Sequence, residues 1–395
     1  MRLCFVLPRF GEKIYGGAEF LTTSIARKLA ERGEQVEILS TCAIDNRTWE
    51  NHFAEGRTTE LGMTVQRFAV DDRDLDCWIP KQIAISEGFR ISVEDQLDWM
   101  QHSVNASKLY AYIAQHKSDF DYFFFAPYLF GTTFWGSQVC PEKSILFPCL
   151  HDESQAYTDV IASMFRNVRG CLFNARAEQE LAEALYGTLR GTEVGLGFEQ
   201  FSEQELSNLK YPFDQKFPYV LCLGRKETGK NAQVLIDDFI AAKENFPQLA
   251  ELKLVIAGGG SFSDLHRDEA LKRPDIIDVQ ALSEVEKRAL IANALCLCNP
   301  SVNESFSIVI MEAWLQHKPV LVSSKCAVTR EHVVESSGGM YFQDANDLAG
   351  VLIELLQSTT LAQELGQNGF NYVTTKYSWP AVIDRFYAGI KEISA

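Results

Sequence analysis

Two loops in the second half of the sequence carry charged residues that could bind a phosphorylated ligand. The first, Gly224 to Asn231, places Arg225 and Lys230 between an apolar run and a predicted helix. A helix start favours acidic side chains, because its free backbone N–H groups carry partial positive charge. Two cations there are better explained by a bound phosphate, and the alternative is a solvated basic loop.

The second loop, Pro300 to Ser307, enters a predicted helix that contains Glu312. Glu304 and Glu312 are eight residues apart, which corresponds to roughly 12 Å at about 1.5 Å per helical residue. A hexose and the ribose of a nucleotide sugar are separated by a similar distance, so each carboxylate could bind one of them. Backbone N–H groups from Ser305 through Phe306 to Ser307 could hold the phosphates between them. The alternative is one capping acid and one solvent-facing acid.

Two further loops with possible ligand contacts lie in the first half. Tyr15 to Glu19 contains Gly16 and Gly17 just before a predicted helix, where the backbone could approach an anion closely. The pattern is not the dinucleotide-binding fingerprint, so a dinucleotide is not favoured. His151 follows another apolar run and could contact a sugar or an acceptor, although a lone histidine is more often structural.

These loops follow short apolar runs that alternate with amphipathic segments. Such runs, without internal alternation, indicate strands covered on both faces, as in a parallel sheet. The predicted strands are 3–7, 36–40, 64–68, 122–125, 144–147, 170–173, 219–224, 253–257, 295–299 and 319–323. The predicted helices are 19–32, 231–245, 283–294 and 306–315. The alternation of strands and helices predicts a doubly wound α/β fold, and its two stretches predict two domains, residues 1–200 and 210–377. Ligands of such sheets bind beyond the carboxyl ends of the strands, which is where these loops lie.

Composition narrows the function classes. The 395 residues carry a formal net charge of −16, which argues against nucleic acid and leaves at most peripheral membrane contact. No run of about 18 apolar residues exists, and the N-terminus is interpreted as a strand rather than a signal peptide, so we expect a cytoplasmic protein.

The ten cysteines suit a reduced compartment, and Cys296 and Cys298 lack a second pair at zinc spacing. Asp119-Phe-Asp121 precedes an apolar run and is interpreted as a strand entry.

Together the loops resemble the retaining glycosyltransferases of family 4, which have the GT-B fold of two Rossmann-like domains facing a central cleft. The matching segments follow in order along nearly the whole chain: Gly16 to Glu19, His151-Asp152, Val194 to Gly197, Arg225-x4-Lys230 and Glu304-x7-Glu312. Tyr377 to Trp379 and the helix after it, 378–395, resemble the segment that packs back on the N-terminal domain. The family usually has glycines where this chain has Ser305 and Ser307, and often has glycine at the position of His317.

The resemblance implies a role for each site residue. Arg225 and Lys230 would neutralise the diphosphate, Glu304 would bind the donor sugar and steady its anomeric carbon, and Glu312 would bind the ribose. Gly16 and Gly17 would donate backbone hydrogen bonds, and His151 would lie near sugar and acceptor. No cofactor or metal is expected.

The implied substrates are a UDP- or GDP-sugar and a glycan or glycolipid acceptor, as in polysaccharide biosynthesis. The acceptor would bind the N-terminal domain, in which residues 45–101 read as an irregular acidic and aromatic stretch. Two alternatives stay open: a nucleotide-sugar 2-epimerase of the same fold, and a non-catalytic protein that binds nucleotide sugars.

Overall fold

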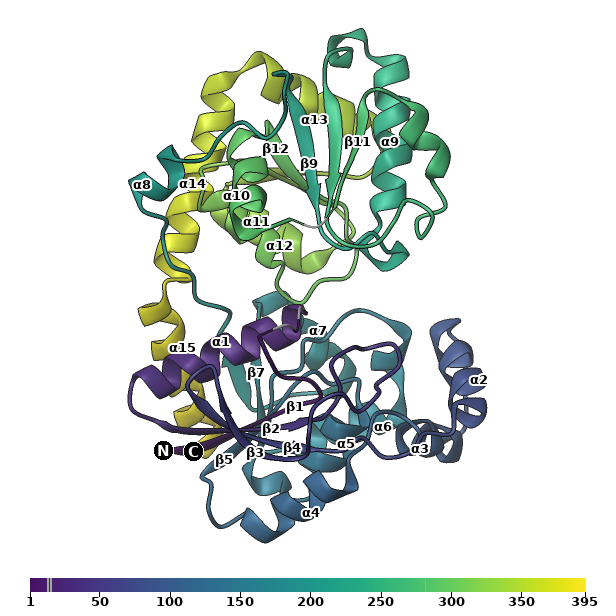
Figure 1. The fold of residues 1–395 in the computed structure, drawn as a ribbon, viewed down its shortest axis with the longest axis vertical. Helices are drawn as coiled ribbons and strands as arrows, with labels where there is room; N and C mark the ends of the chain where they lie inside the picture. The colour runs from purple at the N-terminus through teal and green to yellow at the C-terminus, as the bar shows by residue number, and fades with distance from the viewer. Residues whose placement is uncertain (13, 15, 281) are drawn as a thin grey trace. The chain divides into compact units, whose positions relative to one another are not determined.

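The structure, a computed structural model, describes residues 1–12, 14, 16–280 and 282–395, so the predicted contribution of Tyr15 lies outside the described residues. The chain divides into two compact units, Met1–Gly197 with Trp379–Ala395, and Phe198–Ser378. Each unit has one sheet with helices packed on it (Figure 1). The predicted doubly wound α/β class is confirmed. The assignment of the two predicted domains to acceptor and donor stays a prediction.

The first unit is built on an eight-stranded sheet of order β3-β4-β2-β1-β5-β6-β7-β8, parallel except for the β3–β4 pair. The strands are β1 (Arg2–Leu7), β2 (Gln35–Thr41), β3 (Gly56–Glu60), β4 (Met63–Phe68), β5 (Tyr122–Phe125), β6 (Ser144–Leu146), β7 (Gly170–Phe173) and β8 (Gly191–Glu193). Apolar runs such as β1 and β5 are almost wholly buried, because side chains on both faces are covered.

In the described part of the first half, seven helices pack with the C-terminal helix around this sheet. They are α1 (Gly17–Glu31), α2 (Leu75–Ser86), α3 (Val93–Gln101), α4 (Ser107–His116), α5 (Gly131–Ser137), α6 (Asp159–Asn167), α7 (Arg176–Tyr186) and α15 (Trp379–Ser394). Helix α15 packs against α1, β7 and β8, and the Arg385 guanidinium donates to the carbonyl of Val194 at 2.8 Å. Short 3-10 turns are η1 (Pro141–Lys143) and η2 (Ser154–Tyr157).

The second unit has a six-stranded parallel sheet of order β11-β10-β9-β12-β13-β14. Its strands are β9 (Tyr219–Leu223), β10 (Lys253–Ala257), β11 (Ile276–Val279), β12 (Cys296–Asn299), β13 (Val320–Ser323) and β14 (Gly339–Phe342). Its helices are α8 (Glu203–Ser207), α9 (Ala232–Asn245), α10 (Glu284–Asn293), α11 (Ile308–Trp314), α12 (Ala327–Ser336), α13 (Ala345–Gln357) and α14 (Thr359–Lys376), with 3-10 turns η3 (Thr228–Lys230), η4 (Pro247–Leu249) and η5 (Asp268–Lys272).

The strand order of the second unit fixes where a ligand can bind. The chain starts at β9, adds β10 and β11 on one side, and then returns to add β12 on the other. The direction of winding therefore reverses between β9 and β12, and open parallel sheets bind ligands beyond the strand ends at such a reversal. The two loops that follow these strands are the ones that carry Arg225, Lys230 and Glu304.

Two sequence-based expectations about local structure are wrong. The helix expected over 306–315 begins at Ile308, because Ser307 adopts a left-handed conformation with φ of 73°. The distance between Glu304 and Glu312 is thus not eight helical steps. Residues 45–101 are more regular than expected, since they contain β3, α2 and α3 in addition to β4, which corresponds to the predicted strand 64–68. Polar β3 and proline-containing α2 gave no clear periodic signal.

Other expectations are confirmed. All ten cysteines are free and nine are buried, including Cys296 and Cys298 in β12. Asp121 accepts a hydrogen bond from the backbone N–H of Arg2 at 2.8 Å, which is the expected role at a strand entry. Within the described ranges no helix is both long and apolar enough to cross a membrane.

Candidate functional site

The winding reversal of the second unit brings two predicted site residues into direct contact. The Lys230 ammonium lies 2.8 Å from Glu304 Oε1, although the two residues are 74 positions apart. The Lys230 side chain is 33% exposed and Glu304 is 13% exposed, so the lysine is the more accessible member of the pair. A cation and a carboxylate held together at a strand-end edge can bind a ligand that has both anionic and hydroxyl groups.

Arg225 lies on the same loop as Lys230, but its side chain points into solvent. It is 57% exposed and pairs with Glu227 at 3.1 Å. Lys226 anchors this loop to the neighbouring strands. Its buried ammonium pairs with Asp278 at 2.9 Å and also donates to the carbonyl of Gly258. The buried Lys226 ammonium therefore holds the loop backbone in place. The exposed Arg225 side chain can exchange its ion pair with Glu227 for one with an anionic ligand.

The Glu304 loop is held by a network around Asn299 at the end of β12. The side-chain oxygen of Asn299 accepts from the backbone of Ser301 at 3.0 Å, and its amide donates to Ser307 Oγ at 2.7 Å. Asn231 donates to the carbonyl of Pro300 at 3.2 Å and so connects this loop to the Lys230 loop. The backbone around Glu304 is thus braced before any ligand binds.

Phe306 anchors the same loop in an aromatic cluster. Its ring contacts His332 and Tyr377 edge-on, with centroids 5.3 and 5.0 Å away. Burial lowers the pKa of His332 to about 3, so the imidazole is neutral and packs as an aromatic ring. No motif in the sequence marks His332 as part of this site.

Glu312 lies in α11 and is paired with a residue that the sequence analysis missed. Lys287 in α10 donates to Glu312 Oε1 at 2.7 Å. Burial raises the pKa of Glu312, and the neighbouring Lys287 ammonium counteracts that rise. The Lys287 ammonium therefore already balances the charge of the Glu312 carboxylate. A ribose hydroxyl would have to share this carboxylate with Lys287.

Two positions where the sequence resemblance leads us to expect glycine have a glycine-like backbone here. Ser307 has φ of 73° and His317 has φ of 54°, a region that costs most side chains about 1 kcal/mol. The Ser307 hydroxyl gains a hydrogen bond from Asn299, and the His317 ring stacks on Phe370 with centroids 4.1 Å apart. These contacts offset the backbone cost, so the loop shape does not require glycine.

In the first unit, Gly16 is the N-cap of α1 in an extended conformation. A Cβ on Gly16 would collide with the carboxylate of Glu19, which folds back over the helix start and pairs with Arg9. A Cβ on Gly17 would meet nothing within 4 Å. Gly17 thus leaves its backbone approachable, whereas Gly16 is needed to admit Glu19.

His151 lies in the loop after β6, with its ring 31% exposed and Nδ1 3.9 Å from Glu153. Its loop is tied down by a residue that the sequence analysis missed. Glu178 is buried in α7 and accepts hydrogen bonds from the backbone N–H groups of Leu150 and Asn174, both at 2.6 Å. One carboxyl group therefore joins the β6 and β7 ends next to His151. A glutamate on the apolar face of α7 was the available signal.

We expect the role of Glu178 to be visible in the pH dependence of stability. Burial raises the pKa of Glu178 to about 8, against 4.5 for an ordinary glutamate. Between these values the unfolded chain loses a proton that the folded chain keeps, so the contribution of Glu178 to stability falls as pH rises. Glu178→Gln should lower the melting temperature, because an amide nitrogen cannot accept from a backbone N–H, and the gap to the parent should shrink from pH 5 to pH 8.

Melting curves of both proteins, followed across this pH range, check the prediction. Glu183→Gln is a control in the same helix, on its partly exposed side. A gap that stays constant from pH 5 to pH 8 would mean that Glu178 is ionised in the folded protein, because both states would then bind the same number of protons.

Comparisons with known proteins match the second unit, which carries Arg225, Lys230, Glu304 and Glu312, to a family of transferases. Residues 203–372 match the family model described as glycosyl transferases group 1. Trehalose synthase of Thermococcus litoralis is 23% identical over 196 residues, which are 45% of this chain and 47% of that protein. The MMP alpha-(1->4)-mannosyltransferase of Mycolicibacterium hassiacum is 33% identical over 113 residues, 27% of each chain. The chain thus spans less than half the length of these relatives.

Solved structures resemble the whole chain. Sucrose-phosphate synthase from Thermosynechococcus elongatus superposes with a TM-score of 0.73 at 16% identity and 99% coverage of both chains. Anabaena HepE, solved in complex with UDP-glucose, superposes with a TM-score of 0.70 at 15% identity and 100% coverage of both chains. Residues 203–372 are therefore similar to the group 1 glycosyl transferases, and the chain as a whole has the two-unit α/β fold of GT-B glycosyltransferases.

Proposed function

We propose that this chain is a retaining glycosyltransferase of family 4, which moves a hexose-type sugar from a UDP- or GDP-sugar to a hydroxyl of a glycan or glycolipid. The contact between Lys230 and Glu304 carries the proposal, because it joins a phosphate-binding cation to a sugar-binding carboxylate at the winding reversal. Arg225 reorients to the diphosphate, Glu312 binds the ribose, and Ser305 to Ser307 offer backbone donors. The similarity of residues 203–372 to group 1 glycosyl transferases supports the same assignment.

The first unit supplies the remaining contacts in this proposal. Gly17, with Gly16 beside it, offers backbone N–H groups, and His151 lies near sugar and acceptor. The acceptor hydroxyl attacks the sugar from the face that the diphosphate leaves, and the leaving phosphate takes its proton. Such a reaction depends on orientation and on charges already in place, rather than on a protein nucleophile. The complexes of HepE with UDP and UDP-glucose support a UDP-sugar donor.

The test begins with thermal-shift screening against UDP-, GDP-, ADP- and TDP-sugars. The stabilising donor is then incubated with candidate acceptors, and the anomeric configuration of the product is read by NMR. A product with the donor's own anomeric configuration supports the proposal, and inversion contradicts it. Release of a free epimer without acceptor identifies a 2-epimerase, and binding without turnover identifies a non-catalytic binder.

We also expect transfer to proceed at an unchanged rate in EDTA. Arg225 and Lys230 together carry two positive charges, which match the charge of a divalent ion and stabilise the departing diphosphate. Initial rates with and without EDTA measure this directly. Loss of activity in EDTA that manganese restores would contradict the proposed diphosphate chemistry.

A further inference from the structure

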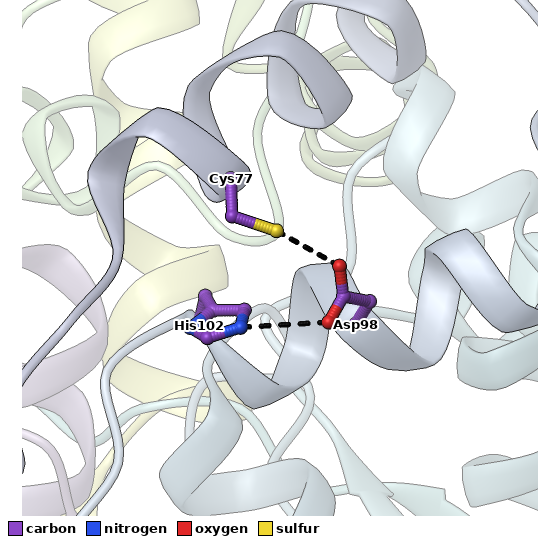
Figure 2. A group of neighbouring side chains, drawn as sticks. All are labelled: Cys77, Asp98 and His102. Atoms are coloured by element: carbon purple, nitrogen blue, oxygen red, sulfur yellow. Dashed lines mark hydrogen bonds and ion pairs between the residues drawn. The ribbon is translucent and has the colours of Figure 1, made fainter.

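Three side chains that the proposed transfer does not use meet between helices α2 and α3 of the first unit. Cys77 is in the first turn of α2, Asp98 is in α3, and His102 follows the last turn of α3 (Figure 2). The Cys77 thiol donates to Asp98 Oδ2 at 2.9 Å, and His102 Nε2 lies 3.4 Å from Asp98 Oδ1. Their ligand atoms all lie within 4.8 Å of one another.

This spacing suits a small metal ion. A tetrahedral zinc ion with bonds of about 2.0 to 2.3 Å separates its ligand atoms by roughly 3.3 to 3.7 Å. The separations in this cluster, from 2.9 Å to at most 4.8 Å, span these values, so side-chain rotations would complete the geometry. One sulfur, one imidazole nitrogen and one carboxylate oxygen form a set that suits zinc, and not the all-oxygen set that magnesium or calcium prefers.

A cation already occupies part of this cluster. The Lys81 ammonium, one turn after Cys77, lies 2.9 Å from Asp98 Oδ2 and 3.2 Å from Cys77 Sγ. A lysine ammonium is charged at neutral pH, so this competitor carries a full positive charge. Asp95 is 4.0 Å from the same ammonium and can accept it if a metal displaces it.

The charges around the cluster also favour a divalent ion. Asp74 caps α2 by accepting from the backbone N–H of Cys77 at 3.0 Å, and Asp76 follows in the same turn. A second cation, Arg73, lies over the Trp78 ring and donates to the carbonyl of His102. Cys77 is the one cysteine of the ten that is not buried, so it is open to metal from solvent.

We propose that Cys77, Asp98 and His102 form a zinc site that joins α2 to α3, with water as the fourth ligand. Binding releases the thiol proton to solvent and moves the Lys81 ammonium to Asp95. Thiolate and carboxylate then balance the two charges of the zinc ion, and the imidazole stays neutral. The site belongs to the first unit and shares no residue with the proposed donor site, so either proposal can fail alone.

The test uses the full chain, stripped of metal, and titrated with zinc by calorimetry and with cobalt by absorbance. We expect one ion per chain and a thiolate-to-cobalt charge-transfer band in the near ultraviolet. Cys77→Ser should abolish the band, and Cys77→Ser and His102→Gln should each weaken zinc binding at least about 100-fold. Lys81→Met should bind zinc more tightly than the parent, because the competing ammonium is gone.

His116→Gln is the matched control, since His116 and Asp119 form a half-exposed pair at 2.8 Å without a cysteine. It should leave zinc binding unchanged. Absence of binding in both the parent and Lys81→Met would overturn the proposal, as would binding that survives Cys77→Ser and His102→Gln. If EDTA slows transfer in the parent but not in Cys77→Ser, the sensitivity comes from this site rather than from the diphosphate.

Discussion

Glu304→Gln is expected to slow sugar transfer at least about 100-fold, the usual cost of losing one pre-positioned charge at a reacting centre. The carboxylate is only 13% exposed and is held against Lys230, so its charge acts at short range. The amide keeps the size of the side chain and leaves the Asn299 network intact. It also frees Lys230 for the diphosphate, so donor affinity should hold or improve while turnover falls.

Steady-state rates and donor titration of the same variant separate the two effects. Glu227→Gln is the control, because Glu227 also pairs with a cation of this region, Arg225, and its side chain is more exposed, at 42%, than that of Glu304. It should turn over at nearly the parent rate. Near-normal turnover of Glu304→Gln would remove Glu304 from the reaction, whereas equal losses in both variants would indicate a general effect of charge.

Lys230→Ala should weaken donor binding roughly 10- to 100-fold, with a smaller loss for Arg225→Ala. Lys230 is the more important of the two because its removal also leaves the largely buried Glu304 carboxylate without a counter-charge. Arg225 starts in solvent, so its contribution appears only when the diphosphate is bound. Arg225→Lys should recover part of the loss, since it restores the charge but not the bidentate grip.

Donor binding by calorimetry and turnover with saturating acceptor check these values. Lys272→Ala, which removes a well-exposed cation of the same unit, should change neither. Magnesium or manganese should not restore activity to Lys230→Ala. Rescue by either ion, or parent-like binding in both alanine variants, would show that the diphosphate binds elsewhere.

Much of the local structure follows from short-range pattern. Runs such as Tyr122–Phe125 and Gly170–Phe173 are strands with the predicted ends, because continuous apolar residues are buried on both faces of a parallel sheet. Ser283 and Glu286, three residues apart, form a capping box at the start of α10, with Ser283 Oγ 2.6 Å from the Glu286 carboxylate. Such signals come from residues that are consecutive or only three to four positions apart. They can therefore be recognised in a single sequence.

The local signals failed where neighbours decide the conformation. Strand β14 begins with Gly339, and β3 is polar and pairs antiparallel at the sheet edge, so neither has the apolar run of a central strand. Helix α11 starts two residues later than predicted, because the Asn299–Ser307 bond accompanies a left-handed turn before it. A single sequence does not reveal a bond between positions eight apart on either side of a loop.

The sequence by itself therefore determined the α/β class, the two-unit organisation of the pattern and the identity of the charged loops, because these depend on periodicity and residue type. The tertiary structure decided which loops meet. Lys230 contacts Glu304 because β9 and β12 are neighbours in the sheet, and strand order depends on how helices pack across the whole unit. For the same reason Lys287, His332 and Glu178 emerged only from the fold, since each acts on a residue at least 25 positions away.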